Sequence, residues 1–278
     1  MHPTNASKNP NTYQSLFNTA ANQRYHYLHW GAPSKPKLIF IHGALANAYW
    51  FEHIAPHFCE HYQVICISLP GHGKSEWQQT YNLDHFLDII QQQCLPTHPK
   101  DILIGHSLGA RLSLYFLEKN PYHLRNIILL DPPIGTPYFR KKDTWTRQHP
   151  HYENAQDLIQ RFRIIPKQPL MHPDICQHIA QRSIIQDANG FRWQFDPNFF
   201  NKIDHTTILN IQPPSYTNCN IHLIYGKNSQ VTTTQTIKKL QEQFQITSIH
   251  PLENAWHAIM IDQPQALIDT IKNIYKTL

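Results

Sequence analysis

The residues in this sequence that most clearly could do chemistry form the pentapeptide Gly-His-Ser-Leu-Gly at residues 105–109. After Asp101, an apolar run at residues 102–104 leads into it, and a helical pattern at residues 110–118 follows at once. A serine in G-x-S-x-G between a strand and a helix is typical of a nucleophile held on a sharp turn, with glycines where side chains would collide with the backbone. The N-terminus of the following helix favours developing negative charge. We therefore predict that Ser107 is a nucleophile.

A serine hydroxyl needs a base to take its proton, and histidine commonly serves. The chain has 20 histidines, so composition does not choose among them. His257 differs by its context, because it lies in a loop after a late strand and just before a final helix that starts near Pro264. We expect Asp262 to cap that helix at its N-terminus. A histidine in this loop would reach over the sheet edge toward Ser107, and we predict that it is the base.

Short apolar runs alternate with helical patterns along most of the chain. Runs typical of strands occupy residues 25–30, 37–42, 62–68, 126–131, 220–225 and 246–250, and helical patterns occupy residues 49–58, 83–94 and 233–244. This alternation predicts βαβ units and a parallel sheet that helices cover on both faces.

The alternation is interrupted after Asp131. The next part of the chain contains two helix-like stretches, residues 153–165 and 173–185, among polar and proline-rich segments. An aromatic cluster follows at residues 191–200. We predict that this part is an insertion that covers the site.

These patterns divide the chain into three parts. Residues 20–131 and 219–278 are predicted to form the main domain, and residues 132–218 the insertion. Residues 1–19 are predicted to be a polar N-terminal extension.

Composition excludes or disfavours several classes of protein. The chain has 278 residues, of which 41% are hydrophobic and 15% charged, as in a globular domain. The net charge of +5 is modest and its one basic cluster is residues 140–142, so nucleic-acid or anionic-membrane binding is poorly supported. No apolar run approaches membrane-spanning length, and the N-terminus lacks a secretory signal. Five scattered cysteines predict reduced thiols in the cytoplasm.

Taken together, these motifs give the chain a resemblance to serine hydrolases of the α/β-hydrolase fold, from about residue 25 to residue 275. The resemblance rests on His-Gly-Ala-Leu at residues 42–45, Leu-Pro-Gly-His-Gly-Lys-Ser at residues 69–75, the pentapeptide at residues 105–109, Tyr225-Gly226, and His257 followed by Asp-Gln-Pro at residues 262–264. Six of the nine glycines fall on these motifs.

The resemblance implies an α/β fold with a mostly parallel sheet of the eight-stranded type and a helical cap inserted after the sixth strand. It places the oxyanion hole at the backbone N–H groups of Ala44 and Leu108. It implies no cofactor.

The chain departs from the family pattern at the third catalytic residue. In this family an aspartate usually stands three residues after the glycine that ends the seventh strand, and Ser229 stands there in this chain. Serine cannot supply the negative charge that stabilises an imidazolium. We predict that Asp131, which closes the apolar run at residues 126–131, supplies it. Three other carboxylates rank below it: Glu253, Asp204 and Asp262.

Two histidine pairs have spacing that could suit a cation: His149 with His151, and His53 with His57. Neither pair has a third ligand at a recognisable spacing. We predict no metal and no cofactor.

These observations favour a serine hydrolase that cleaves an ester or thioester of a small, largely apolar acyl substrate through an acyl-enzyme. Two alternatives stay open. The same serine and histidine could serve a carbon–carbon bond hydrolase or a lyase, and the missing acid at residue 229 could mark a non-catalytic binding protein. The substrate and the oligomeric state stay open as well.

Overall fold

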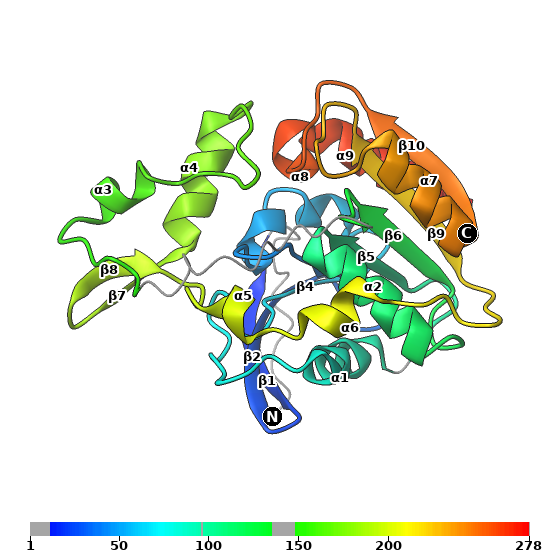
Figure 1. Cartoon of the computed structure of the whole chain (residues 1–278), viewed down its shortest axis with the longest axis horizontal. Helices are drawn as coiled ribbons and strands as arrows, with labels where there is room; N and C mark the ends of the chain where they lie inside the picture. Colours follow the sequence, from blue (N-terminus) through cyan, green and yellow to red (C-terminus); the bar gives the residue numbers. More distant parts are fainter. Residues whose placement is uncertain (1–11, 96, 135–147, 278) are drawn as a thin grey trace, which may run out of the picture.

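The computed structural model describes residues 12–95, 97–134 and 148–277. Within them, eight strands form one sheet in the order β1-β2-β4-β3-β5-β6-β9-β10 (Figure 1). The strands are β1 (Gln14–Ala20), β2 (Gln23–Trp30), β3 (Lys37–Ile41), β4 (Gln63–Ile67), β5 (Ile102–His106), β6 (Asn126–Leu130), β9 (Asn220–Gly226) and β10 (Ile246–Leu252). β1 and β2 run antiparallel to their neighbours, and all the other pairs are parallel. The mostly parallel sheet is therefore confirmed.

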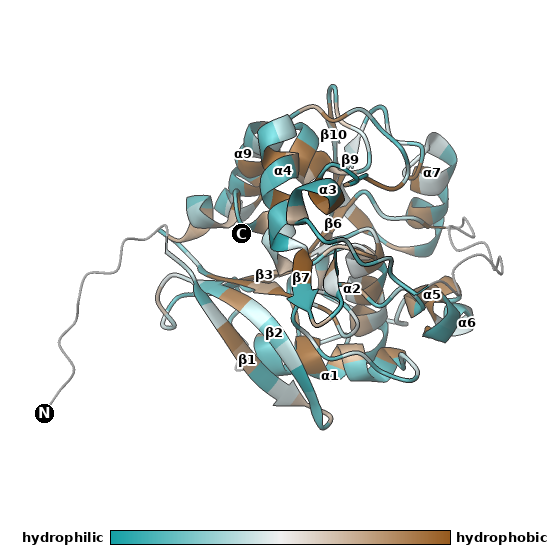
Figure 2. Ribbon diagram, turned by 90° about the vertical axis from the view of Figure 1, so that its left-hand side faces the viewer, coloured by the Kyte–Doolittle hydropathy of each residue, from teal (hydrophilic) through white to brown (hydrophobic). Residues whose placement is uncertain are grey.

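Alternate residues of the central strands face opposite sides of the sheet. On β3, Ile39 and Ile41 join one hydrophobic cluster, whereas Leu38 and Phe40 join the other. The first cluster includes α1 (Leu83–Cys94), α2 (Leu108–Lys119) and α7 (Thr234–Gln243); the second includes the 3₁₀ segments η1 (Ala48–Phe51) and η2 (Ala55–Phe58) with α8 (Ile259–Asp262) and α9 (Pro264–Lys276). In Figure 2 the inner strand β3 is brown, while β1 and β2 carry many teal residues.

The chain between β6 and β9 forms separate elements beside the sheet. They are α3 (Ala155–Ile159), α4 (Pro173–Arg182), β7 (Ile184–Asp187), β8 (Gly190–Trp193), α5 (Phe199–Lys202) and α6 (His205–Leu209). β7 and β8 pair as an antiparallel hairpin outside the main sheet. Figure 1 shows α3, α4 and this hairpin grouped at the left, away from β9 and β10. The basic cluster at residues 140–142 lies outside the described residues.

Three segments differ from the sequence-based expectation. The described end of the expected N-terminal extension forms β1, an edge strand that the sequence pattern does not reveal because its side chains are mostly exposed. The helix expected at residues 49–58 is two short 3₁₀ segments, and Pro56, which lacks a backbone N–H, stands in the first turn of the second. The helix expected at residues 153–165 is limited to α3.

Among the described residues, none of the helices combines the length and apolar character needed to cross a membrane.

Candidate active site

Ser107 lies at the turn between β5 and α2, with an unusual backbone conformation of φ +53°. A side chain on either flanking glycine would collide with the backbone. A Cβ at Gly105 would lie 2.2 Å from the carbonyl oxygen of Gly109, and one at Gly109 would lie 2.2 Å from that of Ile41. The two glycines thus permit the close packing that holds Ser107 in its strained conformation.

His257 connects Ser107 to a carboxylate. Its Nε2 lies 3.0 Å from Ser107 Oγ, and its Nδ1 lies 2.7 Å from Asp131 Oδ2. An ionised carboxylate only accepts hydrogen bonds, so Nδ1 donates to it and Nε2 can accept from the serine hydroxyl. All three side chains are buried. The structure therefore brings together the three residues that the sequence analysis grouped.

Asp131 reaches His257 because β6 and β9 are parallel neighbours, with Leu130 opposite Ile224. Three donors surround its carboxylate. Oδ1 accepts from the backbone N–H of Gly226 at 3.1 Å, and Oδ2 accepts from Ser229 Oγ at 2.6 Å as well as from His257. Ser229, which stands where the family pattern has an aspartate, thus contacts the carboxylate that lies one strand away.

The other carboxylates that the sequence offered have different partners. Glu253 pairs with Lys227 at the surface. Asp204 caps the N-terminus of α6. Asp262 is the last residue of α8 and is not the N-cap of α9, which is Gln263. Burial raises the pKa of Asp262 to about 6.

Asp262 takes part in a contact that the sequence did not reveal. It accepts from the backbone N–H of Trp256 at 2.8 Å, and Nε2 of Gln168 lies 2.9 Å from both of its oxygens. Oε1 of Gln168 accepts from the backbone N–H of Ala258 at 3.1 Å. These bonds hold Trp256 and Ala258, the residues on both sides of His257. Gln168 belongs to the segment between β6 and β9, so that segment contacts the loop that carries His257.

The expected oxyanion donors lie on two segments beside Ser107. Leu108 is the first residue of α2, where backbone N–H groups have no partner within the helix. Ala44 lines the same pocket as Ser107. The preceding Gly43 lies so near that a Cβ there would be 3.1 Å from Ser107 Cβ. Both N–H groups therefore come from segments next to the serine.

Two buried histidines support this region. Nδ1 of His42 donates to the carbonyl of Gly43 at 2.7 Å, and its Nε2 accepts from the backbone N–H of Leu69 at 2.9 Å. Nε2 of His106 donates to the carbonyl of His257 at 2.9 Å. Burial holds the pKa of His42 and of His106 well below the usual range, so both rings stay neutral and their roles as donor and acceptor are fixed.

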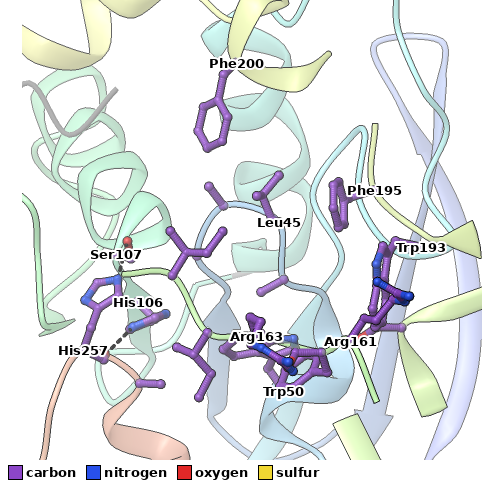
Figure 3. Close-up of a pocket in the computed structure, with 18 residues that line it drawn as sticks. Leu45, Trp50, His106, Ser107, Arg161, Arg163, Trp193, Phe195, Phe200 and His257 are labelled. Carbon is purple, nitrogen blue, oxygen red and sulfur yellow. Dashed lines mark hydrogen bonds between the residues drawn. The ribbon is translucent and has the colours of Figure 1, made fainter. Parts of the chain in front are cut away.

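A cavity of about 200 Å³ opens at Ser107 (Figure 3). Apolar side chains make up most of its wall. Leu45 and Trp50 come from the chain that follows β3, Trp50 from η1, and Phe162, Trp193 and Phe200 come from the segment between β6 and β9. That segment also contributes two arginines, Arg161 and Arg163, which the sequence analysis did not single out. No signal in the sequence separates them from ordinary surface arginines.

The histidine pairs considered as cation ligands make other contacts. Nε2 of His149 lies 2.6 Å from the carbonyl of Phe195, and that of His53 lies 2.7 Å from the carbonyl of Met260. His151 pairs with Asp187. The described residues contain no group of three or more histidine, cysteine or acidic side chains that could hold a metal ion.

Comparison with known proteins assigns the family. The family model described as "alpha/beta hydrolase fold" matches residues 36–245. The chain belongs to this family. Esterase Rv0045c of Mycobacterium tuberculosis is 23% identical over 275 residues, covering 90% of this chain and 86% of that protein.

Solved structures agree on the fold of this α/β hydrolase. The thioesterase domain from the curacin biosynthetic pathway superimposes with a TM-score of 0.76 at 21% identity, covering 94% of this chain and 99% of that one. E-2-(Acetamidomethylene)succinate hydrolase gives a TM-score of 0.77 at 19% identity, covering 94% and 98%. The relatives support hydrolase activity on this fold.

Proposed function

We propose that the protein is a serine hydrolase that cleaves an ester or thioester of a small-molecule acyl substrate through an acyl-enzyme. The observation that carries the proposal is the continuous contact from Ser107 Oγ through the His257 ring to the Asp131 carboxylate, at 3.0 Å and 2.7 Å. Such an arrangement activates a serine, because the base accepts the hydroxyl proton and the carboxylate stabilises the resulting imidazolium.

In the first half of the reaction, Ser107 Oγ attacks the carbonyl carbon and its proton passes to His257 Nε2. The carbonyl oxygen becomes an oxyanion, which the N–H groups of Ala44 and Leu108 stabilise. When the tetrahedral intermediate collapses, the bond to the alcohol or thiol breaks and His257 gives its proton to that leaving group. Asp131 remains ionised and keeps the ring oriented.

In the second half, water replaces the leaving group. His257 accepts a proton from the water as it attacks the acyl carbon, and returns that proton to Ser107 Oγ when the acid is released. The same N–H groups stabilise the second oxyanion. No metal or cofactor takes part in the proposed cycle.

We propose further that residues 132–218 act as a cap that sets the acyl preference, on a main domain of residues 20–131 and 219–278 to which β1 adds an edge strand. The described part of this segment supplies Phe162, Ile164, Trp193, Phe195 and Phe200 to the cavity wall, which supports a largely apolar acyl group. The five free, buried cysteines support a reducing, cytoplasmic setting.

Steady-state hydrolysis of p-nitrophenyl acetate tests the proposal. Ser107→Ala and His257→Ala should each lower kcat by about 10³ or more, as expected when a group that acts only in catalysis is removed. The thermal unfolding midpoint of each variant shows whether the fold is retained. Turnover by folded Ser107→Ala at the wild-type rate would refute the mechanism.

A further inference from the structure

The charges around the cavity at Ser107 are all of one kind. Arg161 and Arg163 line it and are the charged side chains of the described lining. Among the described residues, no aspartate or glutamate is part of the lining. A cavity whose formal charges are positive favours a ligand that carries negative charge.

The other arginines in the described part of the inserted segment have carboxylate partners. Arg182 pairs with Glu52, and Arg192 pairs with Asp187. Arg161 and Arg163 form no ion pair with a carboxylate within the residues that the structure describes. Their charge is therefore not neutralised there by a neighbouring side chain.

Local contacts already orient both guanidinium groups. Nη1 of Arg163 donates to the carbonyl of Gln160 at 2.9 Å and to that of Phe162 at 2.7 Å. The guanidinium carbon of Arg161 lies 5.3 Å from the centre of the Tyr152 ring. Both side chains remain exposed, so a ligand in the cavity can reach them. An oriented guanidinium loses less entropy when it binds a carboxylate or phosphate.

The two arginines and the nucleophile lie on different sides of a largely apolar cavity. Figure 3 shows Ser107 and His257 on one side of the cavity, and Arg161 and Arg163 on the other side, toward Trp193. Most of the other lining residues are apolar, among them Leu45, Ile164 and Phe200. The cavity thus has a reactive side and a positively charged side within a largely apolar wall.

We propose that Arg161 and Arg163 bind an anionic oxygen group of the substrate, a carboxylate or a phosphate, while the scissile carbonyl lies at Ser107. This proposal deepens and rests on the proposed hydrolase function. The substrate class is an ester or thioester with an apolar acyl group and an anionic group remote from the scissile carbonyl. The anion belongs either to the far end of the acyl chain or to the leaving group.

Two matched pairs of substrates distinguish these sources. The first pair is p-nitrophenyl esters of linear dicarboxylic acids, from hexanedioyl upward, against the same esters with a terminal carboxamide. The second pair is a coenzyme A thioester against the N-acetylcysteamine thioester of the same acyl group. Within each pair the reacting bond is unchanged, and the anion is present in one member only.

We expect wild type to prefer the anionic member of at least one pair. Arg161→Gln and Arg163→Gln should each reduce that preference about tenfold. This is near the lower end of the effect expected for losing a hydrogen bond between charged groups, because both arginine side chains are exposed. The loss should fall mainly on KM, since the arginines are remote from the reacting atoms. Arg163→Lys should keep most of the preference because it keeps the charge.

Arg125→Gln is the matched control. Arg125 is exposed, lies on the main domain and does not line the cavity, so this variant should leave both preferences unchanged. The thermal unfolding midpoint of each variant shows whether its fold is retained. If these variants keep the wild-type ratio of rates in both pairs, the proposal is overturned.

A binding measurement separates this proposal from the hydrolase mechanism. Calorimetry on Ser107→Ala, with the dicarboxylate monoamide as ligand, reports anion binding without turnover. Binding that Arg163→Gln weakens about tenfold supports the anion site even if the esters are not hydrolysed. Hydrolysis of the neutral esters with no charge preference and no anion binding would leave the hydrolase function standing and refute the anion site.

Discussion

Asp131→Asn removes one charge from the site, and the surrounding donors decide how the new amide lies. With its oxygen toward His257, the asparagine would place its NH₂ group against the backbone N–H of Gly226, which now donates to Oδ1 at 3.1 Å. The opposite orientation satisfies Gly226 and presents NH₂ to His257, while Ser229 Oγ can rotate to accept from it. The second orientation is therefore favoured.

In that orientation the imidazole takes the wrong tautomer. Nδ1 of His257 must accept from the amide, so Nε2 carries the proton and cannot take one from Ser107. The imidazolium also loses its counter-charge. Together these effects should lower kcat by about 10⁴, the order found where a triad aspartate is neutralised. Ser229→Ala removes one of three hydrogen bonds and leaves the charge in place, so we expect a loss of about tenfold or less.

Hydrolysis of p-nitrophenyl acetate, with the unfolding midpoint of each variant, measures this difference. Ser229→Asp in the Asp131→Asn background supplies a sharper test, because Ser229 Oγ lies 2.6 Å from the Asp131 oxygen that contacts His257. An aspartate there moves the acid to the position usual in the family and should restore at least part of the rate. A folded Asp131→Asn protein that retains more than a tenth of the wild-type kcat would refute the assignment of Asp131.

Three further predictions follow from the packing around the site. Gly105→Ala should destabilise the fold by about 3 kcal/mol or more, because the new Cβ would lie 2.2 Å from the carbonyl oxygen of Gly109. Urea unfolding measures this loss, and a variant as stable as wild type would contradict the close packing of the turn. Burial lowers the pKa of His72 to about 4. As the pH falls from about 6.5 to 4, this histidine is protonated in the unfolded chain but stays neutral in the folded one. The free energy of unfolding should therefore fall by up to about 3 kcal/mol across that window. His72→Gln should make the unfolding free energy less dependent on pH there, with exposed His61→Gln as the control; equal slopes in His72→Gln and wild type would argue against a buried neutral His72. Gln168→Ala should lower kcat about tenfold with little change in KM, because it removes the hydrogen bonds to Asp262 and Ala258 that hold the loop carrying His257. An unchanged kcat would show that these bonds do not position the base.

The sequence predicted best the parts of the fold whose signal is local. The helix expected at residues 83–94 is α1, because apolar residues at helical spacing face the sheet and Asn82 caps the first turn. The turn at Ser107 was predictable because the strand, the G-x-S-x-G motif and the helix are contiguous in sequence, and Gly105 avoids a clash with Gly109 four residues later. β1 was not predictable, since an exposed edge strand buries no regular apolar face.

The candidate site was predictable only in part for a similar reason. Asp131 could be predicted because parallel neighbouring strands end at the same edge of the sheet. The hydrogen bond from Ser229 to its carboxylate could not be predicted and is seen only in the structure. Arg161 and Arg163 carry no pattern that distinguishes them from surface arginines. Their place in the cavity depends on how the inserted segment packs over the sheet, which is a long-range property of the fold.

The central claim is that Ser107 is an activated nucleophile, and covalent labelling tests it most directly. Incubation with a fluorophosphonate should add one adduct per chain by intact mass, with the modified peptide containing Ser107. His257→Ala should slow the labelling strongly, and Ser107→Ala should abolish it while its unfolding midpoint stays near that of wild type. Labelling at a different residue, or labelling of Ser107→Ala at the wild-type rate, would contradict the account.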